Sequence, residues 1–226
     1  MTHSCNKIQL TTIIWKQLLQ HSEFLPHKLV ITGTETIPTE LQTPGVVIPR
    51  PDLETHHEEA DVIIVQQAIC LSRCATNNIK ILSDDTDVFV MLVHFYRKLN
   101  LKCAVWMESV DKIKLSDIAA TVHNLGTQAN SLLAVHCLTG CDTTSQFFGI
   151  GKSKAVQVLR SGIEVKHLGC VESSMQQCTA ECTRFISHCY GYKKAVPNMS
   201  DVRYKVWLSK KIPPKIKNLP PTTEAF

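Results

Sequence analysis

The stretch Ile79–Leu99, IKILSDDTDVFVMLVHFYRKL, decides the fold class of this 226-residue chain. Its first part, Ile79–Ser83, is short and rich in β-branched residues, which predicts a strand. Val88–Leu99 then reads as an apolar helix, and Lys102–Met107 as a second strand. Strands that alternate with helices are typical of a parallel sheet with helices on its faces, so we predict an α/β fold.

The segments on both sides of this stretch are expected to be mostly helical. Apolar spacing predicts helices at Lys7–His21, His57–Ala75, Ser116–Asn124 (with Ser116 as its cap), Asn130–Leu138, Lys152–Arg160 and Val171–Tyr190. A short strand is expected at Lys28–Thr32. Thr36–Asp52 contains four prolines and no sustained period, which indicates a loop or linker, and the sequence KKIPPKIKNLPP near the end indicates irregular chain.

Composition and charge are those of a globular protein with a divided charge. The chain is 44% hydrophobic and 19% charged, and no run approaches the roughly 18 apolar residues of a membrane span. Ten cysteines without a secretory signal suggest reduced thiols and therefore an intracellular protein. Residues 1–150 hold 11 Lys and Arg against 15 Asp and Glu, whereas residues 151–226 hold 13 against 5. This division suits a metal site beside a surface for a polyanion, although a basic tail is often only a solvated surface.

Acidic residues gather at three places in the sequence: Glu58, Glu59 and Asp61; Asp84, Asp85 and Asp87; and Asp142. The strand Ile79–Ser83 delivers the second group to the carboxyl end of the expected sheet, where sites form in α/β proteins. Clustered carboxylates repel one another unless cations neutralise them, and their hard oxygens suit Mg²⁺ or Mn²⁺. The plainer reading is that acids in a first helical turn interact with the helix dipole, and that Asp-x-Asp after a strand is a turn or a helix cap.

The segment Phe148–Val156, FGIGKSKAV, contains a Gly-Lys-Ser but is not a nucleotide-binding loop of the P-loop type. That loop requires a glycine five residues before Gly151, where Gln146 stands. Glycine still allows close approach of the backbone to a ligand, and a helix start favours an anion. Gly149 and Gly151 therefore mark either a phosphate-binding turn or only a tight turn between helices.

Taken in order, these motifs resemble those of the flap endonuclease/XPG-like nucleases of the PIN-like superfamily. The resemblance is carried by Glu59-Ala-Asp61, Ser83-Asp-Asp-Thr-Asp87, Leu138-Thr-Gly-Cys-Asp142 and Gly149-Ile-Gly151. The chain looks closest to uncharacterised, often transposon-associated PIN-like proteins with HEEAD, SDDTDV and LTGCDTTS segments, over roughly residues 55–160. The family implies a parallel sheet flanked by helices, a helical hairpin after it, and hydrolysis of DNA phosphodiesters with Mg²⁺ or Mn²⁺.

The resemblance also assigns roles to individual positions. It implies five metal ligands, of which Asp85, Asp87 and Glu59 are also catalytic: Glu59, Asp61, Asp85, Asp87 and Asp142. Glu58 is held in reserve because residues three apart share a helix face, and Asp84 is expected to support the ligands or to be an exposed cap. A phosphate of nucleic acid, DNA rather than RNA, is expected at Gly149 and Gly151 beside a monovalent cation, with further contacts from Lys152 and Lys154. The expected location is the nucleus rather than the cytoplasm.

The resemblance divides the chain into four parts. These are a partial N-terminal segment with a Pro-rich linker (1–56), a PIN-like catalytic core (57–145), a helical-hairpin DNA-binding region (146–195) and a basic Pro-rich tail (196–226). Nucleases of this family begin with a strand that ends in aspartate, whereas Lys28–Thr32 leads into a glycine, so the N-terminal portion of the fold reads as incomplete. The alternatives are a catalytically degenerate module that binds nucleic acid or protein, and an incomplete gene product without a stable function.

Other candidate side chains receive plain interpretations. Cysteines four residues apart, such as Cys178 and Cys182, lie in helical sequence and read as small buried hydrophobes rather than zinc ligands. Cys137, on an apolar helix, and Cys141, beside Asp142, are interpreted as similarly ordinary. His136 is expected in the core. The three tryptophans are too dispersed along the chain for a platform on which bases stack.

Overall fold

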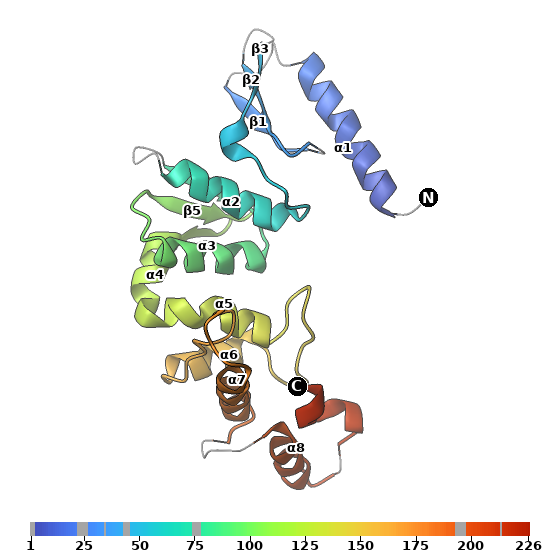
Figure 1. The fold of residues 1–226 in the computed structure, drawn as a ribbon, viewed down its shortest axis with the longest axis vertical. Coiled ribbons are helices and arrows are strands. Elements are labelled where there is room, and N and C mark those ends of the chain that lie inside the picture. The colour runs from blue at the N-terminus through green and yellow to red at the C-terminus, as the bar shows by residue number, and fades with distance from the viewer. Residues whose placement is uncertain are drawn as a thin grey trace. The chain divides into compact units, whose positions relative to one another are not determined.

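The computed structural model of the protein describes residues 3–21, 27–33, 35–42, 46–73, 78–192, 198–212 and 214–226. The chain forms two compact units, Met1–Asn77 and Asn78–Phe226, whose elements are labelled in Figure 1. The protein is mixed α/β with two small sheets, one of which contains a parallel pair, so the α/β prediction is confirmed at this level. In the part of the chain that the structure describes, no helix combines the length and the apolar character of a membrane span.

The described residues of the first unit form two α-helices and an antiparallel sheet (Figure 1). Its elements are α1 (His3–Gln20), β1 (Leu29–Ile31), β2 (Thr39–Gln42), β3 (Val46–Pro49), a 3₁₀ turn at Pro51–Leu53 and α2 (Ala60–Ser72). β2 is the central strand and pairs antiparallel with both neighbours. The predicted strand at Lys28–Thr32 is therefore confirmed as β1, but in an antiparallel sheet.

The prediction of a loop or linker at Thr36–Asp52 is wrong, because β2 and β3 form there. Two of the four prolines occupy positions that a sheet tolerates: Pro38 precedes the central strand, and Pro49 ends β3, an edge strand. Pro44 lies outside the described residues. Leu41 of β2 is fully buried. Arg50, directly after β3, bonds the carboxylates of both Glu40 and Asp52 and so fixes the chain as it leaves the sheet.

Helix α2 begins at Ala60, three residues later than predicted. Glu59 is its N-cap residue, with extended backbone angles (φ −81°, ψ 123°), and Asp61 lies in the first turn. Glu58 therefore precedes the helix, and the expectation that it shares a helix face with Asp61 is wrong. Cys74 and Ala75 at the predicted end lie outside the described residues.

The second unit begins with the parallel pair. β4 (Ile79–Leu82) pairs in parallel with β5 (Val105–Glu108), and α3 (Thr86–Lys98) forms the crossover between them. Alternate residues bury one face of the two strands: Ile79, Ile81, Val105 and Met107. The prediction of a parallel sheet is confirmed for this pair alone, because β6 (Leu115–Asp117) adds to β5 in antiparallel orientation.

Helix α4 (Ile118–Leu125) begins directly after strand β6 and is capped one residue later than predicted. Ser116 lies in β6, and the N-cap residue is Asp117, whose side chain accepts a hydrogen bond from Ala120 N at 2.9 Å. An aspartate at this position satisfies an amide that has no partner within the helix. The predicted cap at Ser116 is therefore wrong by one residue.

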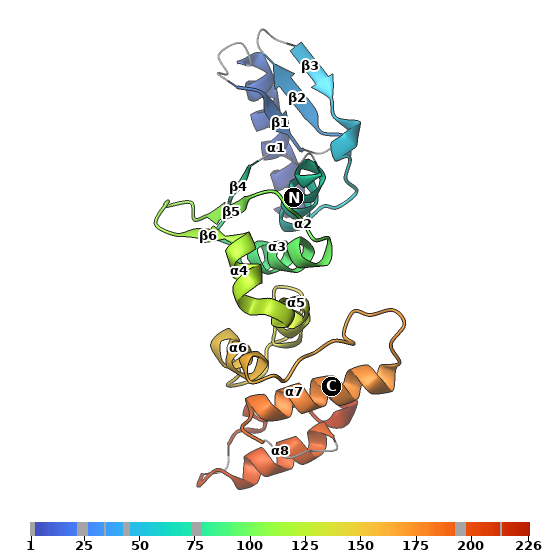
Figure 2. The ribbon, with the colours of Figure 1, turned by 90° about the vertical axis from the view of Figure 1, so that its left-hand side faces the viewer.

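The described residues of the second unit form four further α-helices (Figure 2). They are α5 (Ala129–Leu138), α6 (Lys152–Arg160), α7 (Met175–Cys189) and α8 (Met199–Leu208); α6 packs on α5 and α7, and α7 packs on α8. α7 begins at Met175 rather than Val171 because Ser174 and Gln177 form a capping box. α8 was not predicted, and Asn198 caps it by accepting from Asp201 N.

Candidate functional site

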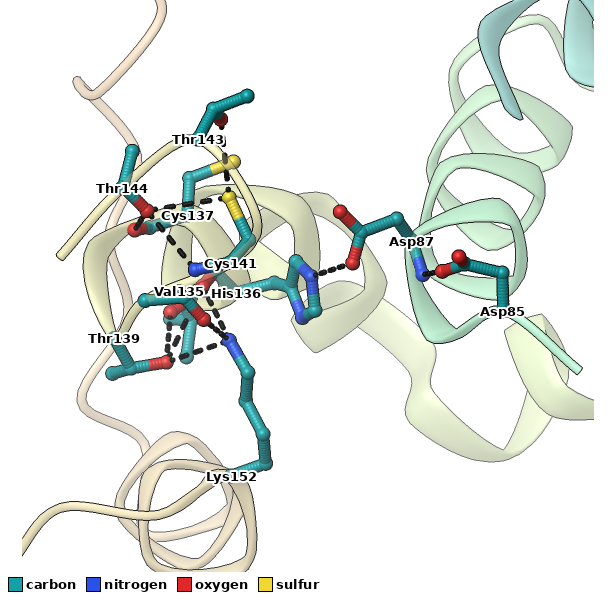
Figure 3. Close-up of polar contacts among 11 residues, drawn as sticks. Asp85, Asp87, Val135, His136, Cys137, Thr139, Cys141, Thr143, Thr144 and Lys152 are labelled. Carbon is teal, nitrogen blue, oxygen red and sulfur yellow. Dashed lines mark hydrogen bonds and ion pairs between the residues drawn. The ribbon is translucent and has the colours of Figure 1, made fainter. Parts of the chain in front are cut away.

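Three segments that are far apart in the sequence meet in the second unit, as Figure 3 shows. They are the start of α3, the end of α5 and the start of α6, and each contributes one polar side chain: Asp87, His136 and Lys152. Asp87 contacts the ring of His136, and the ammonium of Lys152 contacts the backbone carbonyl of the same histidine. We call these three residues the junction.

Asp85, which precedes the junction, is the N-cap residue of α3. Its Oδ1 accepts a hydrogen bond from Asp87 N at 2.7 Å, and its own N–H donates to Ser83 Oγ at 3.0 Å. Such a side-chain oxygen satisfies an amide of the first helical turn. The plainer reading of the Asp-x-Asp motif, a helix cap, is therefore confirmed for Asp85. Asp84 takes a different direction, since its Oδ1 accepts from Val110 N at 3.1 Å.

Asp87 is held by His136. The distance from Asp87 Oδ1 to His136 Nε2 is 2.7 Å. A carboxylate oxygen accepts and does not donate, so Nε2 carries the hydrogen of this bond. The His136 side chain is 7% exposed and that of Asp87 is 30% exposed, so a buried imidazole orients a carboxylate that still reaches solvent. His136 is buried, as predicted, but the sequence did not reveal its partner 49 residues away.

Lys152 caps the end of α5 from the first position of α6. Its Nζ donates to His136 O at 2.6 Å and to Gly140 O, and lies 3.4 Å from Thr139 Oγ1 (Figure 3). The last carbonyls of a helix have no partner within the helix, and a lysine beside them stabilises that end. Burial lowers the pKa of Lys152, while the neighbouring Cys141 and Asp87 act in the opposite direction. Its ammonium is thus directed at carbonyl oxygens rather than at an external phosphate.

The turn after α5 has a tight backbone that depends on one glycine. Gly140 has φ +97°, and a Cβ atom there would lie 2.7 Å from Gln146 Cα. Cys141 and Thr144 close the turn through two backbone hydrogen bonds of 3.2 Å each. Asp142 lies at the exposed corner of this turn. The LTGCD motif therefore builds a turn whose shape requires glycine and which presents an aspartate to solvent.

The thiol of Cys141 lies in a polar environment that its sequence context did not predict. Its Sγ lies 3.4 Å from Thr143 Oγ1 and 3.2 Å from Thr144 Oγ1, and hydrogen bonding by these threonines lowers the pKa of its thiol to about 7. The Thr144 hydroxyl also donates to Cys137 O at 2.7 Å, which leaves Thr143 as the better donor to sulfur. Burial instead raises the pKa of Cys137. Cys141, which is half-buried, therefore has a thiol that ionises more readily than an ordinary one, and it is not the buried hydrophobe that was expected.

The Gly-Ile-Gly segment forms the turn into α6. Gly149 has φ +75°, and Gly151 is the N-cap residue of α6 with φ −98°. A Cβ atom at either glycine would meet nothing within 4 Å, while Ile150 between them is buried. Tyr190 at the end of α7 donates its hydroxyl to Phe148 O at 3.0 Å and braces the turn. The two glycines thus border open space beside a helix start.

The described residues contain no ready-made metal cage. Among them, no group of three or more His, Cys, Asp or Glu side chains is arranged so that it could hold one ion. Glu59 and Asp61 belong to the first unit, whereas the other three predicted ligands belong to the second: Asp85, Asp87 and Asp142. Within the second unit, Asp85 and Asp87 share the start of α3, and Asp142 lies in the turn that follows α5.

A groove of about 1340 Å³ lies in the second unit, and Gly149 of the α6 turn is one of the residues that line it. It is lined by α3, α5, the 144–149 segment and the C-terminal residues, including His94, Lys98, Cys137, Phe147 and Phe226. None of the predicted carboxylate ligands lines it.

Comparisons with known proteins add no relative. No protein-family model, no curated protein and no solved structure matches the chain.

Proposed function

We propose that this protein is a nuclease of the PIN-like type that hydrolyses DNA phosphodiesters with Mg²⁺ or Mn²⁺. The observation that supports this most is the contact between Asp87 and His136. Through it, the acids that follow the parallel strand β4 are joined to the end of α5, from which the turn with Asp142 continues. The order of the acidic and glycine motifs along the chain adds to this support.

The carboxylates of the second unit suit a metal ion that takes some of its ligands from the protein and the rest from water and substrate. Mg²⁺ usually keeps several waters and is bound by one or two carboxylates together with substrate phosphates, rather than by an all-protein cage. Asp85 uses Oδ1 for the helix cap and Asp87 uses Oδ1 for His136, which leaves the second oxygen of each carboxylate for an ion. Asp142 is the third candidate ligand. A bound ion supplies positive charge that stabilises the charge developing on the phosphate.

The residues of the junction would hold the Asp87 carboxylate and the turn with Asp142 in position. His136 fixes the orientation of the Asp87 carboxylate, because its ring is buried and its Nε2–H is committed to that contact. Lys152 holds the last carbonyls of α5 and Gly140, and so keeps the turn with Asp142 in place. A site that holds its carboxylates before the substrate arrives loses less free energy to rearrangement.

The turn at Gly149 and Gly151 would bind the DNA backbone. Its two glycines border open space, and the start of α6 offers backbone N–H groups and the positive end of a helix dipole to a phosphate. Lys154 is exposed and would add a contact that does not depend on base sequence. The monovalent cation at this turn is part of the same proposal and rests on the family resemblance.

Glu59 and Asp61 are the remaining proposed ligands, and they also rest on the resemblance. Glu59 is exposed and its side chain makes no capping hydrogen bond with α2. Asp61 lies half-buried in the first turn of α2. Because these residues belong to the first unit, the cleavage rates of their variants test the first unit's part in the proposal on their own.

The test is cleavage of end-labelled flap, nicked and single-stranded DNA by the full chain in Mn²⁺ and in EDTA. We expect cleavage that needs the metal, and a loss of at least about 100-fold in rate for Asp85→Asn and Asp87→Asn, because each removes a negative charge from the site. Asp84→Asn is the matched control: Asp84 belongs to the same motif but bonds Val110 N. Metal-dependent cleavage that both Asn variants retain would refute the catalytic assignment.

A non-cutting module is the second candidate, and a specific observation favours it. Asp85 is already a helix cap, Asp87 is already bonded to His136, and the ammonium of Lys152 is bonded to carbonyls. These contacts are sufficient for a purely structural role. This alternative expects no cleavage with any metal, but DNA binding that persists in EDTA and weakens steeply with salt.

A further inference from the structure

Helix α8 has one buried face and one face that is open to solvent. The buried face contains Met199, Val202 and Val206, which are spaced by three and four residues. The open face contains three large side chains at the same spacing: Tyr204, Trp207 and Leu208. The packing of α8 therefore uses its first face and leaves an aromatic face without an internal role.

The two rings of this open face lie against each other. The centroids of Tyr204 and Trp207 are 6.4 Å apart, and their planes differ by 19°. Tyr204 is 60% exposed and Trp207 is 44% exposed. Exposed apolar side chains that occur together, rather than singly, mark interaction sites. The three tryptophans are dispersed in the sequence, but Trp207 forms its pair with a tyrosine one helical turn earlier.

The chain from residue 203 onward is basic, although Asp201 lies in the first turn of the same helix. Residues 203–217 contain six Lys and Arg and no Asp or Glu. Arg203 is committed to the fold, because its guanidinium donates to Pro220 O and Ile216 O. Lys205, Lys210 and Lys211 are exposed, and Lys205 Nζ lies 5.8 Å from the ring centroid of Tyr192.

We propose that Tyr204, Trp207, Lys205, Lys210 and Lys211, the α8 platform, bind single-stranded nucleic acid. Unpaired bases stack on exposed aromatic rings, and lysines nearby contact the backbone phosphates. A duplex keeps its bases stacked on one another and would meet only the lysines. The platform is independent of the proposed catalysis: it needs no metal and includes none of the carboxylates.

The test is fluorescence anisotropy of a labelled oligothymidylate titrated with the full chain in EDTA. We expect binding that weakens with salt, and a loss of about tenfold or more for Trp207→Ala and for Tyr204→Ala, since stacking of one base accounts for a change of this order. Trp207→Phe keeps a ring and should recover most of the affinity. Ile113→Ala, which removes an exposed apolar residue (85% exposed) from the β5–β6 hairpin, is the control and should bind like the wild type.

Three outcomes would overturn the proposal. They are no binding of the oligonucleotide, equal binding by the wild type and the two alanine variants, and equal aromatic-dependent binding of a DNA duplex. Vesicles of phosphatidylcholine and phosphatidylserine are titrated in parallel, because an amphipathic face with lysines also suits an anionic membrane surface. Binding to vesicles without binding to oligothymidylate would assign the platform to membranes and overturn the proposal.

The outcome is separable from that of the nuclease proposal. Each variant is first melted, and only variants that melt cooperatively like the wild type are compared. If the protein cuts no DNA but the aromatic variants still lose affinity in EDTA, the platform stands and catalysis fails. If Asp87→Asn abolishes cleavage while Trp207→Ala binds oligothymidylate like the wild type, catalysis stands and the platform fails.

Discussion

Asp87 and His136 lie 49 residues apart in the chain, and their side chains meet at 2.7 Å. The contact joins the first turn of α3 to the end of α5. It therefore links a segment that follows a parallel strand to the turn that carries Asp142.

Breaking the Asp87–His136 pair should destabilise the fold. We expect His136→Leu to lower the free energy of unfolding by about 1–3 kcal/mol, because it removes a hydrogen bond made by a buried ring. Asp87→Asn should cost less, since Asp87 is partly exposed. In urea denaturation the double variant should lose less than the sum of the single losses, by at least about 0.5 kcal/mol. His123→Leu, at an exposed histidine of α4, is the control. Strictly additive losses would show that the two residues are not coupled.

Lys152 should contribute to stability and Lys154 to DNA binding, although they are only two residues apart. Lys152→Met leaves carbonyls at the end of α5 without their donor and should cost about 1–3 kcal/mol of stability. Lys154→Met changes an exposed side chain and should stay within about 0.5 kcal/mol. In DNA titrations at several salt concentrations, Lys154→Met should reduce the slope of log K against log salt by about 1. A large stability loss for Lys154→Met and none for Lys152→Met would contradict the assignment.

Gly140 in the turn after α5 and Gly151 at the start of α6 should have different effects, the first on stability and the second on DNA binding. Gly140→Ala should destabilise the protein by several kcal/mol or prevent folding, because φ is +97° and the new Cβ would lie 2.7 Å from Gln146 Cα. Gly151→Ala has φ −98° and open space, so its effect on thermal unfolding should be within about 1 kcal/mol. If the turn binds phosphate, Gly151→Ala should nevertheless weaken DNA binding. Wild-type affinity in a folded Gly151→Ala protein would leave this glycine as a turn residue only.

Cys141 should react with iodoacetamide near neutral pH. Its pKa of about 7 means that the thiolate fraction rises with pH through 7 and is nearly complete above 8, whereas an ordinary thiol continues to ionise up to about pH 9.5. Mass spectrometry of the modified peptide at several pH values gives the midpoint. Thr143→Val removes the hydroxyl donor and should raise that midpoint. The buried Cys189, whose pKa burial raises to about 11, should stay unmodified in the folded protein.

Much of the second unit could be predicted from local pattern. β4 and α3 were expected from one 21-residue stretch, because a β-branched run followed by a helical apolar pattern needs only neighbours in sequence. β2 and β3 could not be predicted, since their prolines stand at a strand boundary and on an edge strand, and this depends on pairing with other strands. α8 was not predicted because only three of its residues are buried, so its apolar pattern in the sequence is weak.

In the candidate site, too, the local features could be predicted from the sequence and the contacts between helices could not. The helix cap by Asp85 and the turn at Gly140 are local, and the residue types indicate them. The contact of His136 with Asp87 and that of Lys152 with the end of α5 are between helices, and no spacing in the sequence predicts them. Lys152 was expected to bind phosphate because it stands beside Gly151 in the sequence. Its side chain instead donates hydrogen bonds to carbonyls at the end of α5.

The segments that form β4, α3, α5 and α6, and the positions of their glycines and capping residues, follow from side chains that are a few residues apart in the chain. Which polar groups face one another depends instead on how the helices pack. Burial brings the end of α5 against the starts of α3 and α6, and each buried donor or acceptor there must find its partner across that packing.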